Sequence, residues 1–285
     1  MKKKHLIYPV FLPLAGCPSR CVYCDQFKVT GASRFDLEDT LAGIASFISR
    51  NPGREKQVAF YGGSFTALPE DFRKELMHKV RSVSDDITSF RISTHPLFVG
   101  DDILDWCRQA AISTIELGIQ DFCTRVLGQT GRGYTAKEAM EAAIRVKHKG
   151  FELGVQLMPG LPGWNDASLK TNHRALESLE PDLLRLYPLI VIRGTPLEEI
   201  YRKGEYIPLT LEQAVAQCAD YFPLAGAHGI KIIKLGIPSN LKTEDVVAGP
   251  WHPAFGESVK KELLSRKTDF CPSGKQSLTI WLTIC

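Results

Sequence analysis

The stretch that decides the fold reads LIYPVFLPLAGCPSRCVYC and runs from Leu6 to Cys24. Apolar residues dominate its first half, Leu6 to Leu14, and predict a buried strand. Three cysteines, Cys17, Cys21 and Cys24, follow within eight residues. Reactive groups of parallel α/β folds gather where strands end and loops begin. The stretch therefore predicts a strand that carries a cysteine loop at a chemically active edge.

The same residues allow a second interpretation, a bacterial lipoprotein signal. Lysines at positions 2 to 4 precede the apolar stretch, which ends in Leu14-Ala15-Gly16-Cys17. Pro9 and Pro13 interrupt the supposed signal core, and cleavage before Cys17 would leave the next two cysteines without a role. No apolar run approaches the roughly 20 residues that cross a bilayer. We therefore expect a cytoplasmic protein without membrane association, whose thiols stay reduced.

Composition sets only broad limits. The chain has 285 residues, of which 44% are hydrophobic and 24% charged, and this balance excludes intrinsic disorder. Its 35 basic and 32 acidic side chains give a net charge of +3, which is too small to argue for nucleic acid or a membrane surface. Function must be argued from sites.

Strand-like and helical segments alternate along the chain about every 30 residues, which predicts parallel strands joined by helical crossovers. Asp36 and Asp166 are the expected N-caps, and Gly150 and Gly229 the expected helix ends. The predicted strands are Leu6 to Leu14, Gln57 to Tyr61, Ser89 to Thr94, Ser113 to Ile119, Glu152 to Met158 and Leu183 to Val191. The predicted helices are Asp36 to Ser49, Glu70 to Val83, Asp101 to Ala111, Ala136 to Lys149, Asp166 to Leu179 and Leu211 to Ala227.

Six strands and six helices are too few for a closed eight-unit barrel, which takes about 250 residues. We expect an α/β fold of the partial (β/α)6 TIM-like barrel type over residues 6–236, followed by an extension over residues 237–285. The pattern weakens after Leu235. Residues Lys260 to Cys285 read as irregular sequence with an apolar end, Thr279 to Cys285, and could form a cap on the open edge of the barrel or the altered end of a longer protein.

The cysteine triad indicates a metal centre. Three thiolates can bind three irons of a 4Fe-4S cluster and leave one iron open for a ligand. The alternative is structural zinc, which takes four ligands, usually as two pairs. No second pair is present near the triad, which favours the cluster.

The spacing Cys-x3-Cys-x-aromatic-Cys, met here by Cys17, Cys21, Tyr23 and Cys24, resembles the signature of the radical S-adenosylmethionine (SAM) superfamily. The resemblance implies that the open iron holds the methionine part of SAM and that an electron cleaves the sulfonium to a 5′-deoxyadenosyl radical. It also implies that the backbone of Tyr23 lies against the adenine, and that an electron donor such as flavodoxin or ferredoxin supplies the electron.

The second predicted strand ends in Gly62-Gly63-Ser64, which resembles the superfamily's Gly-Gly-Glu element that receives the SAM ammonium. Glycine lets a backbone approach a ligand closely. Ser64 replaces the acid, so this residue is expected to offer a neutral hydrogen-bond acceptor.

Two later segments resemble the SAM contacts of oxygen-independent coproporphyrinogen oxidase. Gln120 is expected to contact the SAM ribose, and Arg132, twelve residues on, to pair with the SAM carboxylate. A helix-capping role is the alternative for the arginine. Ser93 and Gln156 stand where these relatives commonly have acids, and are expected to hydrogen-bond ribose hydroxyls.

The sixth predicted strand and its exit, LRLYPLIVIRGT over residues 184–195, resemble the radical SAM domain of the Elongator catalytic subunit, which acts on wobble uridine of tRNA. Arg185, Tyr187 and Arg193 are expected at the barrel mouth as substrate contacts, through phosphate binding and stacking. Tyr187 could equally be a packed core aromatic.

These observations predict a radical SAM enzyme that modifies tRNA or a nucleoside. The segment after Leu235 is too short for the acetyltransferase domain of the Elongator subunit, and the sequence leaves open whether a separate acetyltransferase works with this chain. The first alternative is porphyrinogen-type or other small-molecule radical chemistry, and the second is a non-catalytic protein that binds a cluster or haem.

Overall fold

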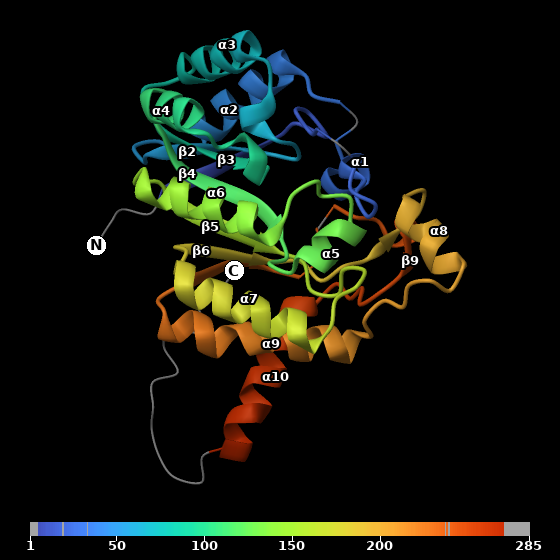
Figure 1. The fold of residues 1–285 in the computed structure, drawn as a ribbon. Coiled ribbons are helices and arrows are strands. Elements are labelled where there is room, and N and C mark those ends of the chain that lie inside the picture. The colour runs from blue at the N-terminus through green and yellow to red at the C-terminus, as the bar shows by residue number, and fades with distance from the viewer. Residues whose placement is uncertain (1–4, 19, 33, 237, 239, 271–285) are drawn as a thin grey trace.

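The structure is a computed structural model that describes residues 5–18, 20–32, 34–236, 238 and 240–270. Seven parallel strands form one curled sheet in the order β1-β2-β3-β4-β5-β6-β8. The strands are β1 (Leu6–Phe11), β2 (Lys56–Tyr61), β3 (Ile87–Thr94), β4 (Ile112–Gln120), β5 (Glu152–Leu157), β6 (Leu183–Leu186) and β8 (Lys231–Leu235). Figure 1 shows an open half-barrel, as the sequence predicts.

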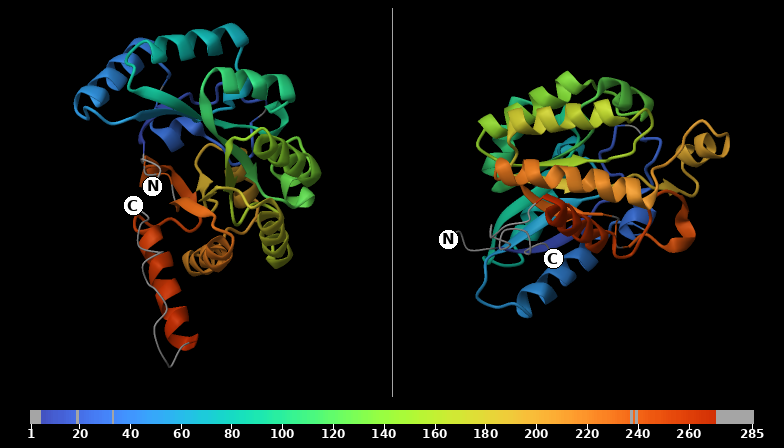
Figure 2. Two further views of the ribbon diagram at one scale, coloured as in Figure 1. Left: turned by 90° about the vertical axis from the view of Figure 1, so that its left-hand side faces the viewer. Right: turned by 90° about the horizontal axis from the view of Figure 1, so that it is seen from below.

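Helices cover the outer face of this sheet (Figures 1 and 2). They are α2 (Leu37–Ser49), α3 (Glu70–Arg81), α4 (Asp101–Gln109), α6 (Ala136–His148), α7 (Asp166–Leu179) and α9 (Leu211–Ala227). Most residues of the central strands are buried, as expected when a parallel sheet is covered on its outer face and filled within. The sheet and its helices share one large hydrophobic core.

Local signals set most helix ends. Asp36 caps α2 through a hydrogen bond from the Asp39 amide, as predicted. The cap of α7 is Asn165 and not Asp166, because the Asn165 side chain accepts from the Ser168 amide. Gly150 and Gly229 follow helix ends in the left-handed region, with φ of +80° and +67°.

The structure adds a strand that the sequence pattern did not predict. β8 joins the sheet beside β6 as its seventh strand. The predicted strand from Leu183 to Val191 is divided, because β6 ends at Leu186 and the chain then forms β7 (Val191–Ile192), which pairs antiparallel with β9 (Val246–Ala248). Short helices flank this region and the loops: α1 (Gln26–Thr30), α5 (Thr124–Gln129) and α8 (Pro196–Arg202).

Part of the segment expected to be irregular is helical. Helix α10 (Phe255–Phe270) packs on α9 and projects from the body of the protein (Figure 2), and Arg266 joins the two helices through an ion pair of 2.6 Å with Asp220. The apolar end, Thr279 to Cys285, lies outside the described residues. Among the helices of the described residues, none has both the length and the apolar character to cross a membrane.

Candidate active site

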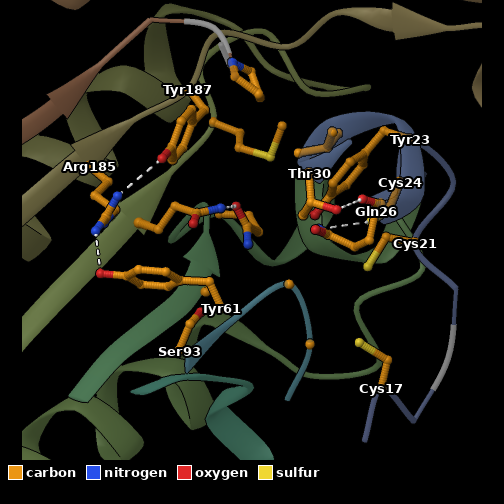
Figure 3. A pocket seen from close by; sticks show the side chains of 18 of the residues that line it. Cys17, Cys21, Tyr23, Cys24, Gln26, Thr30, Tyr61, Ser93, Arg185 and Tyr187 are labelled. Atoms are coloured by element: carbon orange, nitrogen blue, oxygen red, sulfur yellow. Dashed lines mark hydrogen bonds between the residues drawn. The ribbon is translucent and has the colours of Figure 1, made fainter. Parts of the chain in front are cut away.

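A cavity of about 370 Å³ lies inside the curl of the sheet, where the strands end. Figure 3 shows its two sides: the cysteine loop lies on one, and Tyr61, Arg185 and Tyr187 lie on the other. The candidate site therefore has a sulfur-rich end and a charged end, joined by the exits of β2, β3, β4 and β5.

The cysteine loop is fixed by backbone contacts with distant segments. Val22 donates its amide to the Thr130 carbonyl at 3.2 Å, and the Leu197 amide at the start of α8 donates to the Val22 carbonyl at 2.8 Å. Asp25 caps α1 directly after the last cysteine, accepting from the Lys28 amide at 3.2 Å. Segments after β4 and β7 thus set the position of the loop.

The three thiols line the cavity and are free. Polar side chains face them: the Ser64 hydroxyl lies 3.9 Å from Cys17 Sγ, and Gln26 Nε2 donates to Cys24 Sγ at 3.4 Å. Burial raises the pKa of Cys17, and it raises that of Cys24 to about 12. Over the described residues, no three His, Cys, Asp or Glu side chains converge on the position of a single metal ion.

The paired glycines allow the exit of β2 to cross the cysteine loop. A Cβ on Gly63 would lie 2.2 Å from the Ala15 carbonyl oxygen, which no side chain can tolerate. Gly62 has a φ of +91°, in the left-handed region. The Ser64 amide then donates to the same Ala15 carbonyl at 2.9 Å.

Arg132 links the loop after β4 to the cysteine loop. Its Nη1 donates to Cys21 Sγ at 3.1 Å and its Nε to the Tyr134 hydroxyl at 3.0 Å. The Arg132 side chain is buried, and its Nη2 donates to the Gly118 carbonyl, so each of its three nitrogens has a hydrogen-bond partner. The Arg132 backbone amide donates to the Leu127 carbonyl in the last turn of α5 at 3.4 Å, whereas its side chain contacts Cys21, Tyr134 and Gly118.

His95 holds the backbone of Arg132. Its Nδ1 accepts from the Leu97 amide at 3.4 Å, so Nε2 carries the proton and donates to the Arg132 carbonyl at 3.1 Å. Burial, with a further contribution from the Arg132 charge, lowers the pKa of His95 to about 4. The imidazole is therefore neutral and acts as a positioning group.

Gln120 ends β4 in an unusual conformation, with a φ of +70°. Gln156 on β5 donates through Nε2 to Gln120 Oε1 at 3.1 Å. Gly118 leaves the room for this arrangement, since a Cβ there would lie 2.9 Å from Gln120 Nε2. The strain and the glycine together direct the Gln120 amide into the cavity.

The opposite end is built around Glu116 on β4. Its carboxylate accepts from Arg91 Nη1 at 2.7 Å and from Arg185 Nη2 at 3.1 Å. Arg185 also donates to the hydroxyls of Tyr61 at 2.8 Å and Tyr187 at 3.2 Å, as the dashed lines in Figure 3 mark for these two. Burial raises the pKa values of both phenols, so they stay protonated.

The structure brings nearly all the predicted site residues together. The cavity lining includes Cys17, Cys21, Tyr23, Cys24, Gly62, Gly63, Ser64, Ser93, Gln120, Arg132, Gln156, Arg185 and Tyr187. Arg193 is not among them. It is exposed, and its Nε donates to the Glu244 carbonyl at 3.1 Å, because the chain turns away from the cavity after β7.

Other lining residues were not predicted: Gln26, Thr30, Lys234 and Asn240. Gln26 and Thr30 follow Cys24 on α1, so their closeness to the last cysteine was the available signal. Lys234 lies on β8, the strand that the sequence pattern missed.

Comparison with known families identifies the fold. Residues 11–176 match the model of the radical SAM superfamily. This chain belongs to the radical SAM superfamily. Residues 181–265 match the radical SAM C-terminal domain, which includes β6, β8 and the β7–β9 pair. As a radical SAM protein with enzyme relatives, the chain is an enzyme.

Several radical SAM relatives are similar over part of this chain. A tRNA uridine(34) acetyltransferase of Methanocaldococcus jannaschii is 30% identical over 44% of this chain and 24% of its own length. Human Elongator complex protein 3 is 29% identical over 57% of this chain and 34% of its own. An uncharacterized M. jannaschii protein is 24% identical over 85% of this chain and 79% of its own. The matched part of this chain thus spans only about a quarter to a third of these two named enzymes.

Solved structures share the fold. The archaeal Elp3 of Methanocaldococcus infernus superposes with a TM-score of 0.72 at 18% identity, over 92% of this chain and 64% of that one. Coproporphyrinogen III oxidase from Escherichia coli superposes with a TM-score of 0.51 at 19% identity, over 94% and 53%. These superpositions show that the half-barrel fold is shared.

The residues at the sulfur-rich end fit the groups that radical SAM proteins use. Three free thiols are suitable cluster ligands, and the Arg132 guanidinium beside Cys21 suits a carboxylate. The Tyr23 hydroxyl is buried at this end and has no hydrogen-bond partner within the described part of the chain. A buried donor without a partner is costly, so a bound group that accepts from it would stabilise this end.

Proposed function

We propose that this chain binds a 4Fe-4S cluster through Cys17, Cys21 and Cys24, and SAM through the exits of β2, β4 and β5. The arrangement that carries the proposal is the convergence of three free thiols and the Arg132 guanidinium on one end of one cavity. When bound, the cluster supplies one electron, which breaks the sulfonium C5′–S bond of SAM and yields methionine and a 5′-deoxyadenosyl radical.

The protein's own part in this chemistry is positioning. Arg132 is suited to bind the SAM carboxylate. Gln120, whose side-chain amide is held by Gln156, is suited to bind a ribose hydroxyl. Ser64 and Ser93 offer neutral acceptors nearby. His95, neutral and bonded to the Arg132 carbonyl, keeps the guanidinium in place without adding a second charge.

The cavity extends from the sulfur-rich end to Tyr61, Arg185 and Tyr187 on its other side. We propose that the substrate binds there, gives a hydrogen atom to the deoxyadenosyl carbon and so releases 5′-deoxyadenosine. The sequence similarity to tRNA uridine(34) acetyltransferases and Elongator proteins favours a uridine nucleotide, free or within tRNA. A flavodoxin or ferredoxin would supply the electron, and the setting would be the cytoplasm.

The test is anaerobic reconstitution with iron and sulfide, followed by reduction with dithionite in the presence of SAM. We expect 5′-deoxyadenosine to form, and we expect added anticodon stem-loop RNA to increase its yield if the substrate is tRNA. Protein that carries the cluster, binds SAM and forms no 5′-deoxyadenosine under any of these conditions would contradict the enzymatic proposal.

A further inference from the structure

The seventh strand brings one more cation into the cavity. Lys234 on β8 is half-buried and lines the same cavity as the cysteine loop. Its Cα is the register partner of Arg185 on β6. Paired residues on neighbouring parallel strands point to the same face and lie about 5 Å apart. Lys234 therefore stands beside Arg185 at the charged end of the cavity.

An irregularity in the pairing produces this neighbourhood. Leu184 pairs with Ile232, but Arg185 pairs with Lys234, so one extra residue, Ile233, is accommodated in β8. With regular pairing, Arg185 would stand beside Ile233 and Lys234 would face away from the cavity. Bulges next to functional sites re-aim side chains in this way. The backbone of β8 is thus distorted at the one place that turns the lysine inward.

The lysine is not needed to balance charge in the cavity. The ionic side chains of the lining are Glu116, Arg132, Arg185 and Lys234. Glu116 already accepts from Arg185 and from Arg91, and Arg91 also reaches Glu152 at 3.3 Å. Across residues 5–270, within the described positions, no carboxylate pairs with Lys234. Arg185 therefore has a carboxylate partner in Glu116, whereas Lys234 has none within the described part of the chain.

The lining of the cavity also includes the apolar side chains of Pro188, Leu189, Ile190 and Leu241. A partly desolvated ammonium beside a guanidinium is stabilised by an anion that approaches from the cavity, because low-dielectric walls strengthen the attraction. Arg185 is held in place by two tyrosine hydroxyls, so its position does not adapt.

We propose that Lys234, with Arg185 beside it, binds an anionic group of the substrate, a phosphate or a carboxylate. The inference rests on the proposed function only for the statement that the substrate occupies this cavity. An anion site at Lys234 narrows the substrate class to molecules that carry a negative charge away from the carbon that reacts. A neutral nucleoside lacks this group, whereas a nucleotide, free or within RNA, has it.

The experiment measures equilibrium binding to anaerobically reconstituted protein with three probes: uridine 5′-monophosphate, uridine and succinate. Lys234→Met removes the charge and keeps most of the side chain. Lys231→Met is the matched control, because Lys231 is an exposed lysine at the other end of the same strand and does not line the cavity. Lys234→Arg restores the charge.

We expect Lys234→Met to weaken binding of uridine monophosphate or of succinate at least tenfold, and to leave uridine binding unchanged. If Lys234→Met weakens the binding of uridine monophosphate alone, the site binds phosphate. If it weakens the binding of succinate alone, the site binds carboxylate. Lys231→Met should match the wild type, and Lys234→Arg should recover most of the lost affinity. The salt dependence of anion binding should also become weaker in Lys234→Met.

Equal affinity of wild type and Lys234→Met for both anions would overturn the proposal, as would an equal loss of uridine binding. These binding measurements do not depend on whether the protein cleaves SAM. Wild-type protein that forms no 5′-deoxyadenosine contradicts the proposed function and leaves the anion measurements valid. Wild-type protein that forms 5′-deoxyadenosine but binds anions without regard to Lys234 contradicts this inference alone.

Discussion

Arg132 Nη1 lies 3.1 Å from Cys21 Sγ, although the two residues are 111 positions apart in the chain. The contact joins the loop after β4 to the cysteine loop after β1, and both lie at the end of the cavity assigned to SAM. A molecule bound beside Cys21 must therefore also meet the guanidinium.

The first prediction concerns this guanidinium. Arg132→Gln should weaken SAM binding to the reconstituted protein at least tenfold, because a charge-assisted contact to the carboxylate is lost. Iron content should stay close to that of the wild type, since the three thiols remain. Arg193→Gln is the control, because Arg193 is exposed and does not line the cavity. Unchanged SAM affinity in Arg132→Gln would show that another group binds the carboxylate.

The second prediction concerns the thiols. Replacing Cys17, Cys21 or Cys24 singly with alanine should remove most of the iron and sulfide after anaerobic reconstitution, together with the visible absorption near 400 nm. Cys123→Ala should retain both, because Cys123 is a free thiol outside the cavity lining. Full iron content in a single-cysteine variant of the triad would argue against the assigned ligand set.

The third prediction separates two glycines. Gly118→Ala places a Cβ 2.9 Å from Gln120 Nε2 and should weaken SAM binding by displacing that amide. Gly128→Ala in α5 meets no heavy atom within 4 Å. It should stabilise the protein by about 0.5 kcal/mol, because alanine restricts the unfolded chain. SAM titration and denaturant unfolding check the pair, and equal SAM affinity in both variants would remove Gln120 from the proposed site.

The fourth prediction follows from the lowered pKa of His95, about 4 against an ordinary value of 6.5. Above pH 6.5 the imidazole is neutral in both the folded and the unfolded protein. Between pH 6.5 and 4 the unfolded chain binds the proton and the folded protein does not, so stability falls as the pH falls. The loss attributable to His95 should reach about 2 to 3 kcal/mol near pH 4.

His95→Gln can still donate to the Arg132 carbonyl and does not titrate. Denaturant unfolding at pH 7, 5.5 and 4 should therefore give a smaller acid loss for this variant than for the wild type. Parallel stability profiles for the two proteins would mean that His95 is not buried as a neutral group.

The fifth prediction concerns the charge network at the far end of the cavity. Glu116→Gln leaves Arg91 and Arg185 without the carboxylate that both contact, and should lower the free energy of unfolding by about 3 kcal/mol. Glu70→Gln removes an exposed partner of Lys74 on α3 and should change stability little. A similar small effect for both variants would show that the buried network contributes no more than a surface pair.

The sequence alone determined the sulfur-rich end of the site and the class of fold. Periodicity fixed the strands β1 to β5 and the main helices, because parallel strands buried on both faces and amphipathic helices each leave a clear pattern. Cysteine spacing identified the triad, since ligands within one short loop need no tertiary information to be near one another.

Only the tertiary structure decided how distant segments meet. β8 was missed because Lys231 and Lys234 break the apolar run that marks a buried strand, and its place beside β6 depends on sheet pairing. The chain path after β7 turns Arg193 outward, whereas the irregular pairing of β8 turns Lys234 inward. Neither orientation is encoded in local sequence, because each depends on which strand lies alongside. The charged end of the cavity is a product of packing between distant segments.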